Sequence, residues 1–384
     1  MKTALYSYHS GRFFPHAANQ PVNEKKVNLV LCFGSRPLLA RTEIDALIRQ
    51  KFPDAEIVSC STSGEIFHTE IMEETISITA IEFASTRIRT HILNLFDYSD
   101  SAAAGRALVN ELKEKELSYI LVLSDGNLVN GSELVRGMNE VAGNRVLITG
   151  GLAGDDNRFE HTLVGLNGTC QEGMIAGIGF YGTQLEVNHG SLGGWEGFGL
   201  EKKVTRSRHN KLYEIENFSA LELYKQYLGP DAETLPGSAL LFPLLVRLPG
   251  SEEPVVRTIL SIDNDEGSMT FAGDIPVGST VRFMKANFDK LTRAASGAAS
   301  MACPESGNRP ELALVISCVG RKLILKSRTP EEVEAVNEVF GPDTLLTGFY
   351  SYGEISPNGR KGRSELHNQT MTITTFHEIS TIHD

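Results

Sequence analysis

The feature that most constrains the fold of this chain is a passage that occurs twice, at residues 28–83 and 312–376. Each copy reads as an apolar strand, a helix ended by Pro-Asp, a second strand running into Gly-Glu-Ile, and an alternating strand. Asp54 and Glu65 have the same separation as Asp343 and Glu354, 11 residues. We therefore expect an α/β protein with two related halves, whose mixed sheets are layered with helices around an internal repeat.

The residues between the two copies continue the alternation of helices and strands. Helical patterns at 101–115 and 134–141 precede apolar strands at 119–123 and 145–149. A glycine-rich segment at 190–199 then interrupts the pattern. A chain of 384 residues is long for one hydrophobic core. We therefore predict two α/β domains, 1–195 and 196–384.

The helix of the second copy has a recognisable start. Thr329 stands at the N-cap position, Pro330 follows, and Glu332 completes the spacing of a capping box. This spacing predicts that the side chain of Glu332 returns to the backbone of Thr329.

Composition narrows the environment and the partners. The formal net charge is −12, which disfavours nucleic acid and anionic membranes as partners for the protein as a whole. We see no secretory leader and no run of the roughly 20 apolar residues that a membrane span needs. The five cysteines are odd in number and form no CxxC pair, which is typical of reduced thiols. These features predict a cytoplasmic protein.

Common enzyme motifs are missing or weak. The glycines at 177, 179 and 182 match GxGxxG, but strand-like residues flank them on both sides, so we interpret them as packing glycines of a strand. The sequence has no GxxxxGK[ST], no HExxH and no GxSxG.

Three acidic residues beside glycines are the first candidate site. Glu65 and Glu354 follow corresponding strands, and Asp155 follows the glycine-rich turn 150–154. They could face a shared cleft as ligand-binding groups or as an acid and a base. Equally, each Glu could bind its own loop, and Asp155 could cap a turn.

A second candidate site centres on His189. It follows an apolar strand and precedes flexible glycines and Trp195, the single tryptophan. An imidazole and an aromatic wall suit haem, whose iron often takes an axial histidine. His367, before the last repeat strand, could line the same site. A hinge that holds a structural histidine would also explain the pattern.

Several segments, taken in order along the chain, resemble FIST domains. They are Ser59–Ile66, Gly150–Asp156, Val204–Ser207 with Tyr213–Ile215, Phe271–Pro276, Phe349–Ile355 and Leu366–Thr370. The resemblance extends over residues 25–378 and includes both the N-terminal and the C-terminal FIST regions.

The resemblance implies a bacterial, intracellular sensory protein that binds a small molecule. Similar stand-alone proteins bind haem and report nitric oxide to a histidine kinase, and others are linked to cyclic-di-GMP pathways. Because these 384 residues contain no kinase segment, we expect output through a separate signalling protein. A homodimer is compatible with the sequence.

Three functions remain open at this stage. The first is a haem-based nitric oxide sensor with His189 on the iron. The second is a haem-free sensor of an amino acid or another small polar metabolite. The third is an enzyme that uses Glu65 and Glu354, which we disfavour because no catalytic constellation accompanies them.

Overall fold

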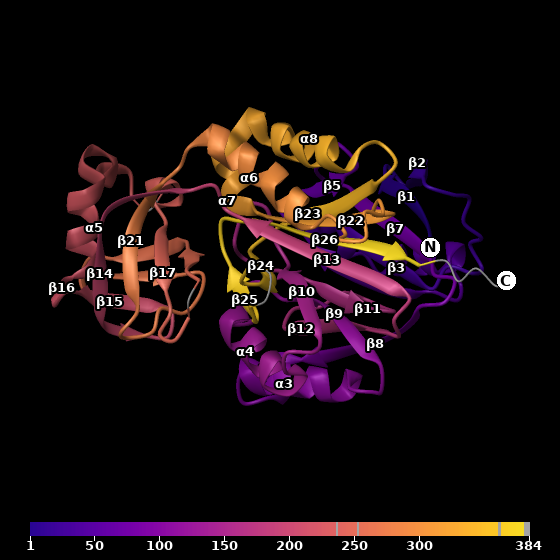
Figure 1. Cartoon of the computed structure of the whole chain (residues 1–384), viewed down its shortest axis with the longest axis horizontal. Helices are drawn as coiled ribbons and strands as arrows, with labels where there is room; N and C mark the ends of the chain where they lie inside the picture. The colour runs from indigo at the N-terminus through magenta and orange to yellow at the C-terminus, as the bar shows by residue number, and fades with distance from the viewer. Residues whose placement is uncertain (236, 252, 360–361, 380–384) are drawn as a thin grey trace.

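A computed structural model describes residues 1–235, 237–251, 253–359 and 362–379 of the chain. It contains three related α/β units packed together and one further domain inserted into the third unit (Figure 1). The predicted α/β class, with mixed sheets and helices, is confirmed. None of the helices in these residues is long and apolar enough to cross a membrane.

Each unit is built on four strands in the same order. Two parallel strands are followed in the sheet by two antiparallel ones, and a helix joins the parallel pair. In unit 1 the strands are β4 (Glu56–Ser61), β3 (Leu29–Gly34), β7 (Ile76–Glu82) and β1 (Lys2–His9). In unit 2 they are β10 (Leu147–Leu152), β9 (Leu117–Ser124), β12 (Met174–Tyr181) and β8 (Arg87–Asn94). In unit 3 they are β23 (Leu345–Ser351), β22 (Leu312–Cys318), β26 (Met371–Glu378) and β13 (Leu185–Leu192).

The helices cover the outer faces of these sheets. The connections between the parallel strands contain α1 (Arg36–Leu39) and α2 (Thr42–Lys51) in unit 1, α4 (Gly131–Ala142) in unit 2, and α7 (Val319–Leu325) and α8 (Thr329–Phe340) in unit 3. Two further helices are α3 (Ser101–Leu112) and α6 (Phe288–Met301). α3 packs on α4, and the alanine-rich α6 packs on α8 and β13, because small side chains allow a close approach.

Each unit lends one strand to a neighbour. β5 (Glu65–Phe67) leaves unit 1 and pairs with β23, β11 (Val164–Leu166) leaves unit 2 and pairs with β4, and β24 (Gly353–Pro357) leaves unit 3 and pairs with β10. Three further strands, β2 (Arg12–Ala18), β6 (Glu70–Met72) and β25 (Ser364–His367), each lie at one edge of these sheets. The exchange closes a ring of three units.

The inner faces of the three sheets share one hydrophobic core. Aromatic rings from all three units meet in it, including Phe33, Tyr119, Phe180, Phe349 and Phe376. Strands covered on both faces can read as continuous apolar runs, as β3 and β22 do, whereas β7 and β26 alternate apolar side chains with buried threonines and serines.

The inserted domain occupies residues 196–285 between β13 and α6. Its strands are β14 (Glu196–Arg208), β15 (Lys211–Ile215), β16 (Phe218–Ser219), β17 (Leu244–Arg247), β18 (Val255–Arg257), β19 (Ile259–Asp263), β20 (Ser268–Phe271) and β21 (Thr280–Lys285). The helix α5 (Ala220–Leu228) covers them, and the domain has a core of its own. The division expected between residues 195 and 196 falls at its entry, and from α6 onward the chain returns to unit 3 (Figure 1).

The predicted capping box on α8 is wrong. Arg328 is the N-cap, and no side chain caps the helix. The carboxylate of Glu332 instead accepts hydrogen bonds from Arg321 Nε and Nη2 at 3.0 and 2.8 Å, and both side chains are fully buried. Ser317 and Tyr350 complete its partners. A buried charge requires such pairing, and this requirement takes precedence over local capping.

The GxGxxG segment is a strand, as the sequence predicts. Its first two glycines lie in β12, and Gly177 faces Leu108 and Leu112 of α3. A Cβ atom at Gly177 would come within 3.0 Å of both leucines, so the glycine permits helix packing.

Units 2 and 3 each have a glycine at the same position of the sheet, where there is no room for a side chain. Gly150 and Gly348 stand opposite Val122 and Val315, and a Cβ atom at either would lie under 2 Å from the facing carbonyl oxygen. We expect Gly348→Ala to lower the free energy of unfolding by about 3 kcal/mol or more, because rigid backbone must move. Urea unfolding measures the change.

The matched control is Gly168→Ala, whose nearest neighbour would lie 3.9 Å away. It should change the free energy of unfolding by less than about 1 kcal/mol. Equal stability of the two variants would contradict the packing described here.

Candidate functional site

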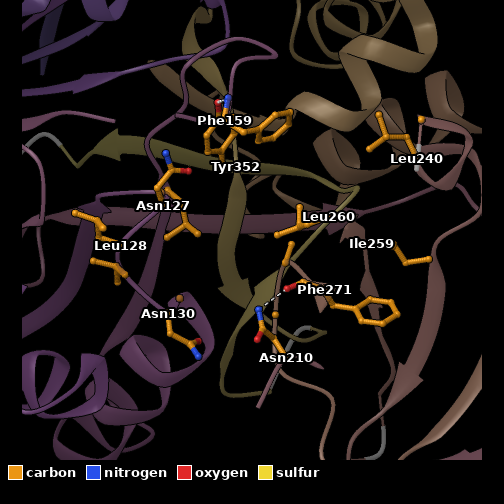
Figure 2. A pocket seen from close by; sticks show the side chains of 17 residues that line it. Asn127, Leu128, Asn130, Phe159, Asn210, Leu240, Ile259, Leu260, Phe271 and Tyr352 are labelled. Carbon is orange, nitrogen blue, oxygen red and sulfur yellow. Dashed lines mark hydrogen bonds between the residues drawn. The ribbon is translucent and has the colours of Figure 1, made fainter. Parts of the chain in front are cut away.

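A large cavity lies between the inserted domain and unit 2. It is a cleft of about 680 Å³, a volume typical of small-molecule sites. Unit 2 contributes the segment 126–131, Leu152 and Phe159, and unit 3 contributes Tyr352 (Figure 2). The opposite wall comes from five segments of the inserted domain, at residues 210, 237, 240, 259–260 and 271–273.

Two stacked aromatic rings form one side of the cleft. The rings of Phe159 and Tyr352 lie 4.6 Å apart with 20° between their planes. The hydroxyl of Tyr352 accepts a hydrogen bond from Phe159 N at 3.0 Å and donates one to Asp156 O at 3.3 Å. Burial raises the pKa of Tyr352, so the phenol stays neutral.

A buried carboxylate holds the segment 126–131 in place. Asp125, directly after β9, accepts hydrogen bonds from the backbone N–H groups of Asn127, Leu128 and Gly173 at 2.7 to 2.9 Å. The side chain of Asn130 then caps α4 by accepting from Glu133 N at 3.2 Å. The loop therefore has a fixed shape before any ligand arrives.

A buried arginine links the inserted domain to the ring of three units. Arg257 donates from Nη1 to Leu366 O of β25 at 2.7 Å and from Nε to Asp274 O at 3.1 Å. Burial lowers the pKa of Arg257 to about 10. On the same wall, Asn210 Nδ2 donates to Phe271 O at 2.7 Å.

The lining is aromatic, aliphatic and amide in character. Asn127, Asn130 and Asn210 supply its side-chain amides, and Leu128 and Leu260 are 43% and 49% exposed there. Among the lining residues that the structure describes, none carries a charge. Such a surface favours a ligand that is itself uncharged, because a charged group would lose hydration without gaining a partner.

Comparison with family models decides the family. The FIST N domain matches residues 28–217, and the FIST C domain matches residues 220–357. The chain belongs to the FIST family. FIST domains are sensory domains of signalling proteins that bind small ligands.

Comparisons with individual proteins do not narrow the function of this FIST protein further. A search of curated proteins found no match. One solved structure that resembles it is a cyanuric acid hydrolase from A. caulinodans, with 8% identity and a TM-score of 0.38. The likeness covers 94% of this chain and 92% of the hydrolase.

In the FIST protein, Glu65 and Glu354 both lie buried at the ends of exchanged strands. Thr62 and Thr75 donate to the carboxylate of Glu65 at 2.6 and 2.7 Å. Ser351 and Thr370 donate to that of Glu354 at 2.7 and 2.8 Å. Each Glu thus binds hydroxyls of its own unit, in matching positions, and neither lines the cleft.

Asp155 is buried and paired with two arginines. Its Oδ1 accepts from Arg36 Nε at 2.9 Å and from Arg158 Nε and Nη2 at 2.9 and 2.6 Å. Burial by itself would raise the pKa of Asp155, but the two guanidinium groups outweigh it and lower the pKa. These contacts pin the loop that carries Phe159.

His189 lies inside β13, which continues to Leu192, and not at the end of a strand as expected. Burial lowers the pKa of His189. It lines a separate pocket of about 230 Å³ with polar neighbours such as Arg145 and Arg363. Trp195 packs near Leu291, and its Nε1 donates to Gln369 O at 2.9 Å.

His367 is buried in β25 and stands opposite Glu354 in the sheet. Its Nε2 lies 3.0 Å from Ser356 O, and burial lowers its pKa to about 4, so the ring is neutral and donates to this carbonyl. The structure therefore brings His367 and Glu354 together, whereas none of the six predicted site residues lines the cleft.

The two buried glutamates predict a pH-dependent stability. Burial raises the pKa of Glu65 to about 7 and that of Glu354 to about 8. An acid whose folded-state pKa is raised stabilises the fold when protonated, and this contribution falls as pH rises from about 4.5 through 7 to 8. We expect the free energy of unfolding to fall over this window, by at most about 1.4 kcal/mol per pH unit for each group.

Urea unfolding at pH 5 and pH 8 measures the effect. The double variant Glu65→Gln with Glu354→Gln should flatten this dependence, whereas the exposed Glu334→Gln should leave it unchanged. An unaltered slope in the double variant would show that both carboxylates ionise freely in the folded protein.

Proposed function

We propose that this FIST protein is a sensor of a small, uncharged and largely planar molecule that binds in the cleft between the inserted domain and unit 2. The observation that carries the proposal is the lining of the cleft. It contains a stacked aromatic pair and three amide side chains, and none of the described residues that line it is charged. A ring would lie against Phe159 or Tyr352, and amides such as Asn127 would select its polar edge.

The position of the cleft supports a sensory role. A ligand there would touch both the ring of three units and the inserted domain. It would therefore bind most tightly to one relative arrangement of these two parts. The resulting shift would alter the surface offered to a separate signalling protein. A histidine kinase or an enzyme of cyclic-di-GMP signalling is the proposed partner, and a cytoplasmic location and a homodimer remain proposals beside it.

Haem with nitric oxide is a more specific candidate for the ligand. The pocket beside His189 does not fit it, because its volume of about 230 Å³ is below the usual range for a drug-sized ligand. The cleft has the volume, but no described lining residue is a histidine, cysteine or methionine. Haem on His189 therefore stays a prediction that this geometry does not favour.

Two alternative functions, the sensing of free amino acids and catalysis, each require residues that the cleft does not offer. A free amino acid would need a carboxylate inside the cleft for its ammonium group, but the described lining has none, and Glu65 and Glu354 are both engaged within their own units. The same engagement removes the acid and base that an enzyme would use. The sensor of an uncharged molecule uses only groups that face the cleft.

Thermal unfolding with a ligand panel tests the proposal. Uncharged planar heterocycles should raise the melting temperature, because a ligand that binds only the folded state stabilises it, and free amino acids should not. Phe159→Ala should weaken the best ligand up to about tenfold, through loss of one aromatic contact of about 0.5–1.5 kcal/mol.

The matched control is Phe96→Ala, which removes an exposed ring that lies outside the cleft. Its affinity for the ligand should equal that of the wild type. If free amino acids raise the melting temperature and Phe159→Ala does not reduce this effect, the ligand site must lie outside the cleft. A stoichiometric haem absorption band that His189→Ala abolishes would replace this proposal with the haem sensor.

A further inference from the structure

Three side chains with metal-binding atoms converge at the edge of the cleft. They are Glu133 of α4, His209 of the turn between β14 and β15, and Asp274 after β20. One ligand atom from each lies within 4.8 Å of the other two. Glu133 belongs to unit 2 and the other two to the inserted domain, so the group spans the boundary that forms the cleft.

Hydrogen bonds hold the segments that carry the three residues, and that of Glu133 is the bond from its backbone N–H to Asn130 Oδ1 at 3.2 Å. Ile275 N donates to His209 O at 3.1 Å, which fixes the turn against the segment that carries Asp274. Asp274 N donates to Ser132 Oγ at 3.3 Å, and Asn130 Nδ2 donates to Asp274 Oδ1 at 3.1 Å. The three groups therefore meet through anchored segments and not through a chance overlap of long side chains.

We propose that Glu133, His209 and Asp274 form a divalent-cation site that clamps the inserted domain onto unit 2. One imidazole and two carboxylates match the ligand types of Zn²⁺, with a fourth position left for water or for a ligand atom. Mg²⁺ and Ca²⁺ prefer oxygen ligands alone, so the histidine selects against them.

The spacing of the ligand atoms gives the site a mechanical effect. His209 Nδ1 lies 3.8 Å from Glu133 Oε1, but two ligands of a tetrahedral zinc ion, each about 2.0–2.1 Å from the metal, lie roughly 3.4 Å apart. A bound zinc ion would therefore hold the ligand atoms closer together than they lie in this structure. Because they come from two sides of the cleft, we expect the cation to hold its walls together.

The neighbours of the three residues carry this movement to the cleft. Asn130 and Gly131 precede Glu133, Asn210 follows His209, and Gly273 precedes Asp274, and all four line the cleft. Cation binding and cleft occupancy should then affect each other reciprocally. This coupling rests on the proposed ligand site, whereas the cation site itself does not.

Two described side chains already contact the proposed carboxylate ligands. Asn130 Nδ2 donates to Asp274 Oδ1 at 3.1 Å, and Arg136 is the charged partner. Arg136 Nη2 lies 3.7 Å from Glu133 Oε1. This distance exceeds a hydrogen bond, and the Arg136 side chain is mostly exposed, so the arginine can turn to solvent when the carboxylate binds a metal.

Calorimetric titration of chelator-treated protein with Zn²⁺ tests the site. We expect one ion per chain, and at least about tenfold weaker binding in His209→Ala and in Asp274→Asn, since even indirect supports of a metal cost 10–100-fold. Mg²⁺ should not compete. His209 is 62% exposed, so its variant should fold normally.

The matched control is His161→Ala. His161 is similarly exposed and pairs with one carboxylate, Glu172 at 3.1 Å, but belongs to no group of three in the described residues. Equal loss in His161→Ala, or unchanged binding in His209→Ala, would overturn the proposed site. Zn²⁺ should also slow hydrogen exchange in segment 126–131, and unchanged exchange would overturn the clamp.

Discussion

The exchange of strands among the three units is the constraint on which the whole structure depends. At each crossing a backbone hydrogen bond joins two units: Ser63 N to Tyr350 O at 2.8 Å, Gly154 N to Ser61 O at 2.8 Å, and Tyr352 N to Leu152 O at 3.3 Å. Each of the three sheets therefore contains strands of two units. A unit on its own would leave backbone groups unpaired at these crossings, which is costly, so the units stabilise one another. The shared aromatic core follows from this ring.

Unit 2 departs from the other two at the same crossing, and the departure builds the cleft. By strand register Asp156 takes the place of Glu65 and Glu354, but Ala153 and Met174 stand where the other units have hydroxyl groups. Without those donors the carboxylate cannot be buried. It instead stays partly exposed and pairs with Arg158, and the loop beyond it carries Phe159 to the cleft.

Sequence reasoning found what local patterns encode. Gly-Glu-Ile and the Pro-Asp helix stop identified units 1 and 3, but unit 2 has neither signal, so its repeat was missed. The cleft was missed for another reason: Asn127, Phe159, Leu260 and Tyr352 are far apart in sequence and share no motif. The one local signal among the cleft residues was Asn130, an N-cap residue type that directly precedes α4. The repeated Gly-Glu-Ile pointed to Glu65 and Glu354, but a repeated carboxylate beside glycine fits a ligand site and a bond to its own loop equally well, so the sequence left the role of the glutamates open.

The connection between the ring and the inserted domain limits how the two can move. The chain enters after Trp195 and leaves before Asn287, and Glu196 and Lys285 pair across the two crossings. The inserted domain is therefore joined to the three units by a single two-stranded ribbon. A rotation about this ribbon would move the domain as one body relative to unit 2, which is the motion that opens or narrows a cleft.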